Sequence, residues 1–144
     1  QQSDNTAAYV LANHIIGIDT IQSLLDQWGM MQTDMINNKT ANNDVYKIMK
    51  KIYEGNIANP AYTQEMLAFF KDTEFEDRIP GLLPKGVQVY HKIGSEIGFM
   101  HDVGVVVGPT TTYYIGIMTS DITDEPEATK LMAETSKLVY DYIK

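Results

Sequence analysis

Two short polar groups in this sequence carry side chains that can do chemistry. Ser3, Asp4 and Asn5 lie near the start of the chain, and Lys92 lies close to a glycine and a serine far along it. A serine hydroxyl both donates and accepts hydrogen bonds, so it can relay a proton, and lysine supplies a positive charge. Taken singly, each has an ordinary structural interpretation, as a serine at a helix start and a solvated lysine on a strand. Only a link between the two groups favours catalysis.

The sequence predicts neither a metal site nor a cofactor. It contains no cysteine, which excludes disulfides and thiolate ligands. The three histidines, His14, His91 and His101, have none of the spacings that metal ligands use.

The acidic balance of the chain limits its partners. The formal net charge is -8 over 144 residues, and no basic stripe exists to neutralise the phosphates of a nucleic acid. Docking on an anionic membrane is disfavoured for the same reason. The chain begins with Gln1 rather than methionine, so we expect that upstream residues, including any export signal, have been removed.

The first half of the chain has the apolar spacing of helices. The four expected helices run from Asp4 to Ile15, from Asp19 to Trp28, from Thr40 to Gly55 and from Asn59 to Phe70. Asp4, Thr40 and Asn59 are expected to cap the helix N-termini with their side chains. A polar connector at residues 30–39 separates the second helix from the third.

Beyond Phe75 the pattern changes to that of a β-sheet followed by one helix. The expected strands are Val87–Ile93, Met100–Val107 and Thr112–Thr119. The final helix is expected to start at Asp124 or at Glu125-Pro126 and to run to Ile143, with a buried stripe of Ala128, Leu131, Leu138 and Tyr142. The order predicts an α+β fold, with a helical part (1–76), then an antiparallel three-strand meander and a C-terminal helix (77–144).

The last expected strand, Thr112–Thr119, is apolar on both faces, as a central strand would be. In a three-strand meander it lies at an edge, where it is open to aggregation. The sequence therefore predicts that something pairs with it. The candidates are strands absent from this chain, or a second copy that forms a homo-oligomer or exchanges a strand.

Two motifs connect the polar groups to a known family. Residues 3–8, Ser-Asp-Asn-Thr-Ala-Ala, resemble the Ser-Asp-Asn loop of class A β-lactamases and related penicillin-binding proteins. Residues 91–95, His-Lys-Ile-Gly-Ser, are similar to the Lys-Thr/Ser-Gly motif that this family carries on a sheet strand. The resemblance covers nearly the whole chain. It implies a single incomplete domain over 1–144 that lacks the family's N-terminal strands and nucleophile helix.

The resemblance implies roles for five residues. Ser3 would pass a proton to the leaving nitrogen, and Lys92 would hold positive charge beside Ser3 and near the substrate carboxylate. Asn5 would bind the amide carbonyl of the substrate. Gly94 would let the backbone approach the substrate, and the N–H of Ser95 would supply half of an oxyanion hole.

Two positions depart from the family pattern around the substrate carboxylate. Ile93 replaces the hydroxyl residue that binds this carboxylate in the family, and the lost hydrogen bond corresponds to about 1.5–3 kcal/mol. The side chain of Ser95 lies on the same strand face and can restore part of the contact. His101 lies roughly where some members carry an arginine that supports the carboxylate. A structural histidine is the alternative interpretation.

The connector at residues 30–39 also departs from the family pattern. Class A β-lactamases use a Glu-x-x-x-Asn element there to activate the hydrolytic water, and this connector contains no glutamate. Asp34 and Asn38 keep the four-residue offset, which makes Asp34 a weak candidate for the deacylation base. The sequence favours impaired deacylation.

None of the five serines is followed three residues later by lysine, so this chain lacks the Ser-x-x-Lys nucleophile motif of the family. The leading hypothesis is the C-terminal portion of a bacterial, exported serine hydrolase. It would form an acyl-enzyme with β-lactams or D-alanyl peptides and need the missing N-terminal half as its partner. The alternative is a non-catalytic binding module or degenerate family member with the same fold.

Overall fold

The computed structural model describes residues 2–144 as an α+β fold, in agreement with the sequence-based prediction. The helices are α1 (Asn5–Val10), the π-helical η1 (Leu11–Ile16), α2 (Ile18–Gln27), α3 (Asn42–Tyr53), α4 (Pro60–Phe69) and α5 (Glu125–Ile143). The strands are β1 (Gln88–Glu96), β2 (Phe99–Val107) and β3 (Thr112–Thr119). No helix within residues 2–144 combines the length and the apolarity needed to cross a membrane.

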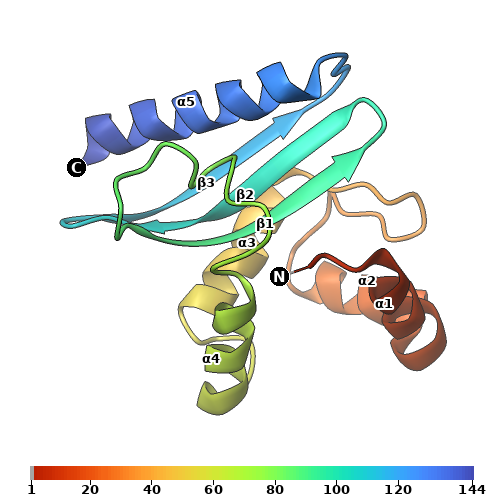
Figure 1. Cartoon of the computed structure of the whole chain (residues 1–144). Coiled ribbons are helices and arrows are strands. Elements are labelled where there is room, and N and C mark those ends of the chain that lie inside the picture. Colours follow the sequence, from red (N-terminus) through yellow and green to blue (C-terminus); the bar gives the residue numbers. More distant parts are fainter. Residues whose placement is uncertain (1) are drawn as a thin grey trace.

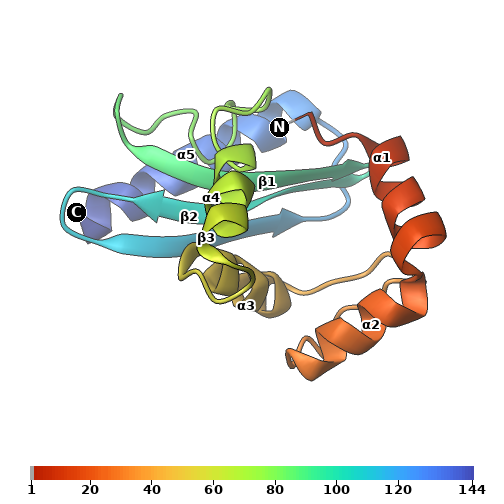
Figure 2. The same ribbon diagram turned by 90° about the horizontal axis from the view of Figure 1, so that it is seen from below.

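The sheet forms the middle of the molecule (Figures 1 and 2). Helix α5 covers one face, α3 lies against the other, and α4 packs on α3 and extends away from the sheet. Helices α1 and α2, with η1 between them, form an arm beside one end of the sheet. The start of α1 therefore approaches the sheet from the side, although it is distant from the sheet in sequence.

Side-chain caps fix the starts of three helices. The carboxylate of Asp4 accepts a hydrogen bond from the Ala7 amide (2.8 Å), and the side chain of Asn59 accepts one from the Tyr62 amide (3.0 Å). Asp124 caps α5 in the same way. These bonds satisfy amides that have no partner in the first helical turn.

The expected cap at Thr40 is wrong. Helix α3 starts one residue later, after Ala41, and Ala41 makes no side-chain cap. The Thr40 hydroxyl instead lies 2.9 Å from the Thr33 hydroxyl in the preceding loop. A threonine can bond its neighbours in the loop as readily as a helix N-terminus, and the sequence does not distinguish the two uses.

The three strands pair antiparallel in the order β1-β2-β3. In β1–β2, Glu96 pairs with Phe99 across a two-residue turn at Ile97 and Gly98. Gly98 has φ 77°, a conformation that glycine adopts without steric cost. The pairing continues to this turn, so β1 ends three residues later than Ile93, the end predicted from the sequence.

The main hydrophobic core lies between the sheet and α5. It contains Ile79, Val89, Val106, Ile115 and Tyr140. Alternation along β1 places Val89, His91, Ile93 and Ser95 on one face of the strand and Tyr90, Lys92 and Gly94 on the other. The core thus holds β1 by one face and leaves the opposite face for the helical part of the chain.

The predicted buried stripe of α5 is wrong at three of its four positions. Ala128 is buried, but Leu131, Leu138 and Tyr142 are exposed. The residues that face the sheet are smaller or more polar: Ala128, Met132, Ala133, Ser136 and Tyr140. The exposed set leaves an apolar outer surface on α5. The sequence-based prediction chose the face with the large apolar residues, but the helix contacts the sheet with the face that carries smaller ones.

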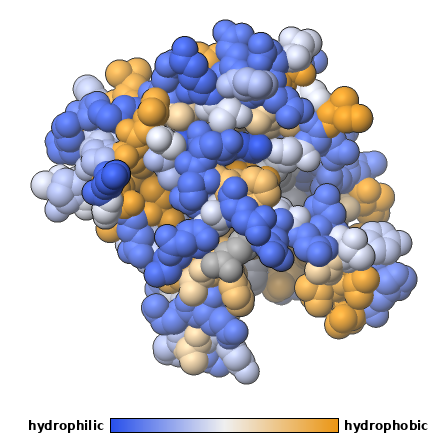
Figure 3. All heavy atoms as spheres, viewed as in Figure 1, coloured by the Kyte–Doolittle hydropathy of each residue, from blue (hydrophilic) through white to orange (hydrophobic). Residues whose placement is uncertain are grey.

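Helix α1 and η1 also expose apolar side chains. Tyr9, Val10, Leu11, Ile15 and Ile16 are all solvent-exposed. Figure 3 shows apolar side chains gathered over this arm, at the lower right. Together with the outer face of α5 and the edge strand β3, this surface resembles a set of core faces without their packing partner.

Mutations on the two faces of α5 should change the stability of the 144-residue chain by very different amounts. Met132 is 1% exposed, so we expect Met132→Ala to lower the free energy of unfolding by about 2–5 kcal/mol. Leu131 is 53% exposed, so Leu131→Ala is expected to change it by no more than about 0.5 kcal/mol. Urea unfolding followed by circular dichroism measures both. Equal losses for the two variants would contradict the orientation of α5.

Candidate active site

The structure brings the two polar groups of the sequence together. Lys92 Nζ donates a hydrogen bond to Ser3 Oγ at 2.5 Å, although the two residues are 89 positions apart. Ser3 has φ 54°, in the left-handed region that residues other than glycine seldom adopt. Backbone strain of this kind is frequent at functional sites. The hydrogen bond closes the helical arm against the sheet.

Strand β1 lies at one edge of the sheet and presents Lys92 there. The His91 amide points away from β2, because it donates to the Phe70 carbonyl at 2.6 Å. Amide directions repeat every two residues in an antiparallel pair, so the Ser95 amide points outward from the same edge. This is the direction that an oxyanion-hole donor beside Lys92 requires.

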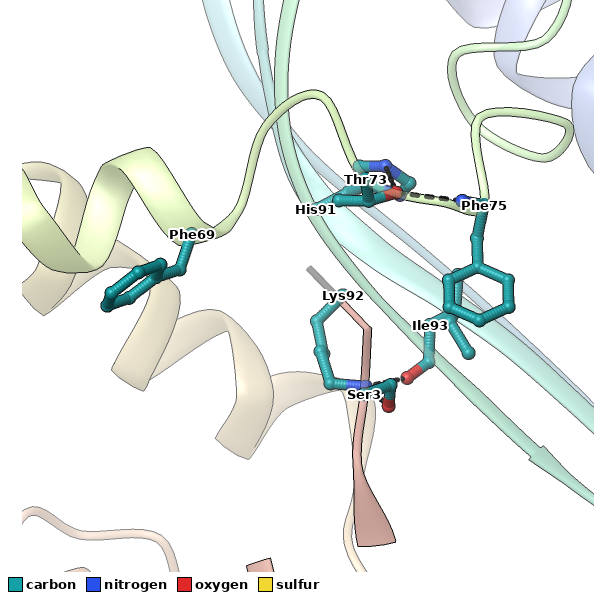
Figure 4. A pocket seen from close by; sticks show the side chains of 7 residues that line it. All are labelled: Ser3, Phe69, Thr73, Phe75, His91, Lys92 and Ile93. Carbon is teal, nitrogen blue, oxygen red and sulfur yellow. Dashed lines mark hydrogen bonds between the residues drawn. The ribbon is translucent and has the colours of Figure 1, made fainter. Parts of the chain in front are cut away.

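Ser3 and Lys92 line a small pocket together with Phe69, Thr73, Phe75, His91 and Ile93. Figure 4 shows the lysine side chain extended toward Ser3, with Ile93 beside it and Phe75 further along. The pocket has a volume of about 20 Å³, which is room for one water molecule. A ligand of more than a few atoms must therefore lie over this pocket rather than inside it.

The surroundings of Lys92 favour loss of its proton. Partial desolvation lowers the pKa of the ammonium; the negative charge of Asp102 opposes this, and the positive charge of Arg78 adds to it. The net effect is a pKa below the ordinary value for lysine. A lysine with a lowered pKa exchanges protons more readily near neutral pH.

Arg78 belongs to this site, and sequence reasoning missed it. Its guanidinium donates to the Ser95 hydroxyl at 2.7 Å and to the carbonyls of Gly94 (3.2 Å) and His101 (2.8 Å). The residue is only 6% exposed, and its Nε has no hydrogen-bond partner among the described residues. A charged residue directly before the apolar Ile79 and Pro80 is the sequence signal that could have identified it.

His91, immediately before Lys92, joins two carboxylates. Its Nδ1 lies 2.9 Å from Asp102 Oδ1, and its Nε2 lies 3.2 Å from Glu76 Oε1. Burial alone would lower the pKa of His91, but the hydrogen bonds and charges of Asp102 and Glu76 outweigh it, so this pKa is raised. The sequence showed His91 only as part of a motif and did not indicate this bridge.

Among residues 2–144, three sequence-predicted residues, Asn5, Asp34 and His101, make no hydrogen bond to Ser3 or Lys92. Asn5 is exposed in the first turn of α1. Asp34 accepts hydrogen bonds from the Ile36 amide and from the backbone and side chain of Asn37, so its carboxylate serves its own loop. The side-chain hydrogen bond from Asn37 is the main cause that lowers the pKa of Asp34, and this makes Asp34 a weaker base.

His101 lies on β2 opposite Gly94. Its Nδ1 is 2.8 Å from the Met100 carbonyl oxygen and 3.2 Å from the Thr119 amide, and its ring packs edge-on to Phe99. These contacts hold the ring between β2 and β3, and its role at the site stays a prediction. Within residues 2–144, no group of three His, Cys, Asp or Glu side chains is arranged to hold a metal ion.

Comparison with known proteins agrees with this geometry. A sequence profile of the Beta-lactamase enzyme family matches residues 1–143. No curated protein matches the sequence. The resemblance to solved structures extends over nearly the entire chain.

Three solved structures illustrate the likeness. PBP-A is 28% identical over 97% of this chain and 56% of its own, with a TM-score of 0.84. The TLA-1 extended-spectrum β-lactamase is 24% identical over 98% and 60% (TM-score 0.84). A β-lactamase from Chitinophaga pinensis DSM 2588 is 22% identical over 99% and 61% (TM-score 0.88).

The chain spans 56–61% of the length of these solved structures. A mutant of PBP-A that resembles the chain with a TM-score of 0.85 was solved as an acyl-enzyme complex with penicillin G. The family match covers all but the last residue, and the fold places the Ser-Asp-Asn and Lys-x-Gly motifs against each other. The chain therefore belongs to the β-lactamase enzyme family.

Proposed function

We propose that this chain forms part of the active site of a serine hydrolase that opens β-lactams or D-alanyl peptides through an acyl-enzyme. The observation that carries the proposal is the hydrogen bond from Lys92 Nζ to Ser3 Oγ at the edge of the sheet. The attacking hydroxyl comes from a segment outside residues 1–144, because no Ser-x-x-Lys occurs within them. Acyl transfer of this kind needs a proton donor for the leaving nitrogen as well as a nucleophile.

The direction of the Ser3–Lys92 bond supports this role for Ser3. Lys92 donates and Ser3 Oγ accepts, so the hydroxyl hydrogen of Ser3 remains available to another acceptor. The nucleophile hydroxyl gives its proton to a base outside residues 1–144 and its oxygen bonds to the carbonyl carbon. As the carbon–nitrogen bond breaks, Ser3 gives its own proton to the nitrogen. Lys92 replaces it, and the lowered pKa of Lys92 favours that transfer.

The outward amide of Ser95 and the positive charges of Lys92 and Arg78 suit the oxyanion and the carboxylate of the substrate. The amide of Ser95 would bind the developing oxyanion. Lys92, with Arg78 behind Ser95, would attract the substrate carboxylate. Ile93 lines the pocket without a hydroxyl, so the carboxylate would depend on Ser95 and the two cations.

We further propose that release of the acyl group is slow. The loop at residues 30–39 contains no glutamate, and the hydrogen bonds of the Asp34 carboxylate come from residues of that same loop. The chain therefore offers no base in this loop for a hydrolytic water. In that case the protein acts as a penicillin-binding acyl-transferase or a slow hydrolase.

We also propose an exported, cell-surface location, since D-alanyl peptides are constituents of the bacterial cell wall. The natural partner of the exposed apolar surfaces is the remainder of the same domain. Strand β3 is an edge among the described strands and carries no charged residue that would discourage pairing. When that remainder is absent, we expect two copies to associate through Thr112–Thr119.

Incubating the full-length protein with a penicillin tests the proposed function. Intact mass spectrometry should show a covalent adduct with the mass of the antibiotic that persists for minutes or longer. Lys92→Ala should slow its formation about 100-fold or more, the usual scale for loss of proton-transfer assistance. Lys85→Ala removes the same charge from the turn before β1 and should leave the rate within twofold.

Failure to detect an adduct has two interpretations, which depend on whether the antibiotic is consumed. No adduct together with undiminished antibiotic would exclude the acyl-enzyme and favour a binding module. Rapid loss of the antibiotic without an adduct would refute slow deacylation but leave the hydrolase assignment intact.

Replacing Ile93 by threonine tests the carboxylate site. The new hydroxyl can donate a hydrogen bond to the substrate carboxylate, a gain of about 1.5–3 kcal/mol. The second-order rate of acylation should therefore rise about tenfold to a hundredfold. Ile97→Thr, at an exposed turn position, is the matched control and should have no effect. An unchanged rate in Ile93→Thr would mean that the carboxylate is bound away from this position.

A further inference from the structure

The segment that joins α4 to β1, residues 70–87, connects the helical part of the chain to the sheet. We call it the crossover segment. It supplies Thr73 and Phe75 to the pocket that contains Lys92 and Ser3. Figure 4 shows Thr73 and Phe75 on this segment, close to the strand that carries His91 and Lys92. Residues 73–75 thus form one wall of the pocket, which we call the Thr73–Phe75 wall. The position of this wall determines the shape of the pocket.

The wall is a tight turn organised around one carboxylate oxygen. Glu76 Oε1 accepts hydrogen bonds from the Thr73 amide (2.7 Å) and the Thr73 hydroxyl (2.9 Å). The Phe75 amide donates to the Thr73 hydroxyl at 3.0 Å. The turn is thus rigid within itself, and its attachment to the sheet depends on what Glu76 and Thr73 contact outside it.

The side chain that they contact is His91. Its Nε2 lies 3.2 Å from both Glu76 Oε1 and Thr73 Oγ1, while its Nδ1 bonds Asp102. Asp102 in turn accepts from the Ile79 amide at 2.9 Å, further along the crossover segment. His91 and Asp102 are 1% and 0% exposed, whereas the side chain of Glu76 is 46% exposed. The imidazole is therefore a buried bridge between strand β2 and a partly solvated turn.

The geometry points to His91 as a positioning residue: its imidazolium, bound to Asp102 and Glu76 at once, holds the Thr73–Phe75 wall against β1, and loss of one proton releases the wall. An imidazolium has two N–H donors, one for each carboxylate. A neutral imidazole has one. If Nδ1 keeps its hydrogen for Asp102, the lone pair of Nε2 faces the oxygen of Glu76, which can turn toward solvent.

The charged groups around His91 give the direction of the pH effect. Asp102 faces it from β2 and Glu76 from the crossover segment. Helix α4 supplies no charge here, only the neighbouring Phe70 carbonyl that bonds the His91 amide. Lys92 points to the other face of β1, and Arg78 bonds residues further along the sheet. The two carboxylates dominate, and the pKa of His91 is raised. The bridge is complete below the ordinary histidine pKa and is lost as pH rises through the raised value.

The consequence for catalysis rests on the proposed function. A released wall widens the pocket beside Lys92, so the rate of acylation should fall on the alkaline side as His91 loses its proton. His91 touches no reacting atom in this scheme. It acts through the wall, and its effect should therefore follow its own titration rather than that of Lys92.

Nuclear magnetic resonance of the full-length protein separates this proposal from the proposed function. The ring signals of His91 report its titration, and the amide shifts of Thr73 and Phe75 report the wall. In the unaltered protein we expect both amide shifts to step at the His91 midpoint. In Glu76→Gln, which keeps an oxygen for Thr73 but removes the charge, the His91 midpoint should fall. The pH at which the amide shifts of Thr73 and Phe75 change should fall by the same amount, or the change should disappear.

Glu74→Gln is the matched control, since it removes the same charge from an exposed position two residues away. It should leave the His91 midpoint and the amide step unchanged. Amide shifts that ignore the titration of His91, or a step that stays in place in Glu76→Gln, would overturn the proposal. Acylation by penicillin is measured on the same samples. If the amide shifts of Thr73 and Phe75 follow the titration of His91 but no penicillin adduct forms, the His91 bridge would be supported and the proposed function refuted.

Discussion

The buried carboxylate of Asp102 is the constraint on which the site depends. A fully buried charge is tolerated only where hydrogen bonds and an opposite charge replace its hydration. Asp102 has both, from the imidazole of His91 and the amide of Ile79. Its partners lie on β1 and on the crossover segment, so satisfying one carboxylate brings together three parts of the chain. The strand that carries Lys92 is held in place by that requirement.

Around this anchor the chain concentrates positive charge. The molecule as a whole carries a net charge of -8, yet Lys92 on β1 and Arg78, which bonds Gly94 and Ser95 of that strand, lie near each other. Arg78 is buried and bonded to two backbone carbonyls and the Ser95 hydroxyl. A fixed, desolvated cation polarises its neighbours more strongly than one in water. An otherwise acidic protein can therefore attract an anionic substrate at one place.

The sequence predicted most of the architecture because its signals are local. Caps such as Asp4 and Asn59 and the apolar run Thr112–Thr119 act over a few residues. The two motifs also identified Ser3 and Lys92 as candidate partners. The face of α5 could not be predicted from apolar spacing, because small residues such as Ala133 pack closely against the sheet while Leu138 stays exposed.

The support of the site could not be predicted for a different reason. His91, Asp102, Glu76 and Arg78 interact across elements, and each alone is an ordinary charged or polar residue of a strand or a turn. Their relation is a product of strand register, in which His91 pairs with Gly104, and of the path of the crossover segment. Only the tertiary structure shows that Arg78 faces inward and that Asp34 bonds its own loop.

The long sequence separation of Ser3 and Lys92 has a consequence for the order of folding. The strands pair with their immediate neighbours in sequence, so the sheet and α5 can form through short-range loop closures. The Ser3–Lys92 contact instead closes a loop of 89 residues, and its entropic cost is met only after most other contacts exist. Among the described residues, α1 and η1 pack mainly on each other and on α2. The helical arm can therefore detach in a local opening that dismantles the Ser3–Lys92 pair while the sheet stays folded.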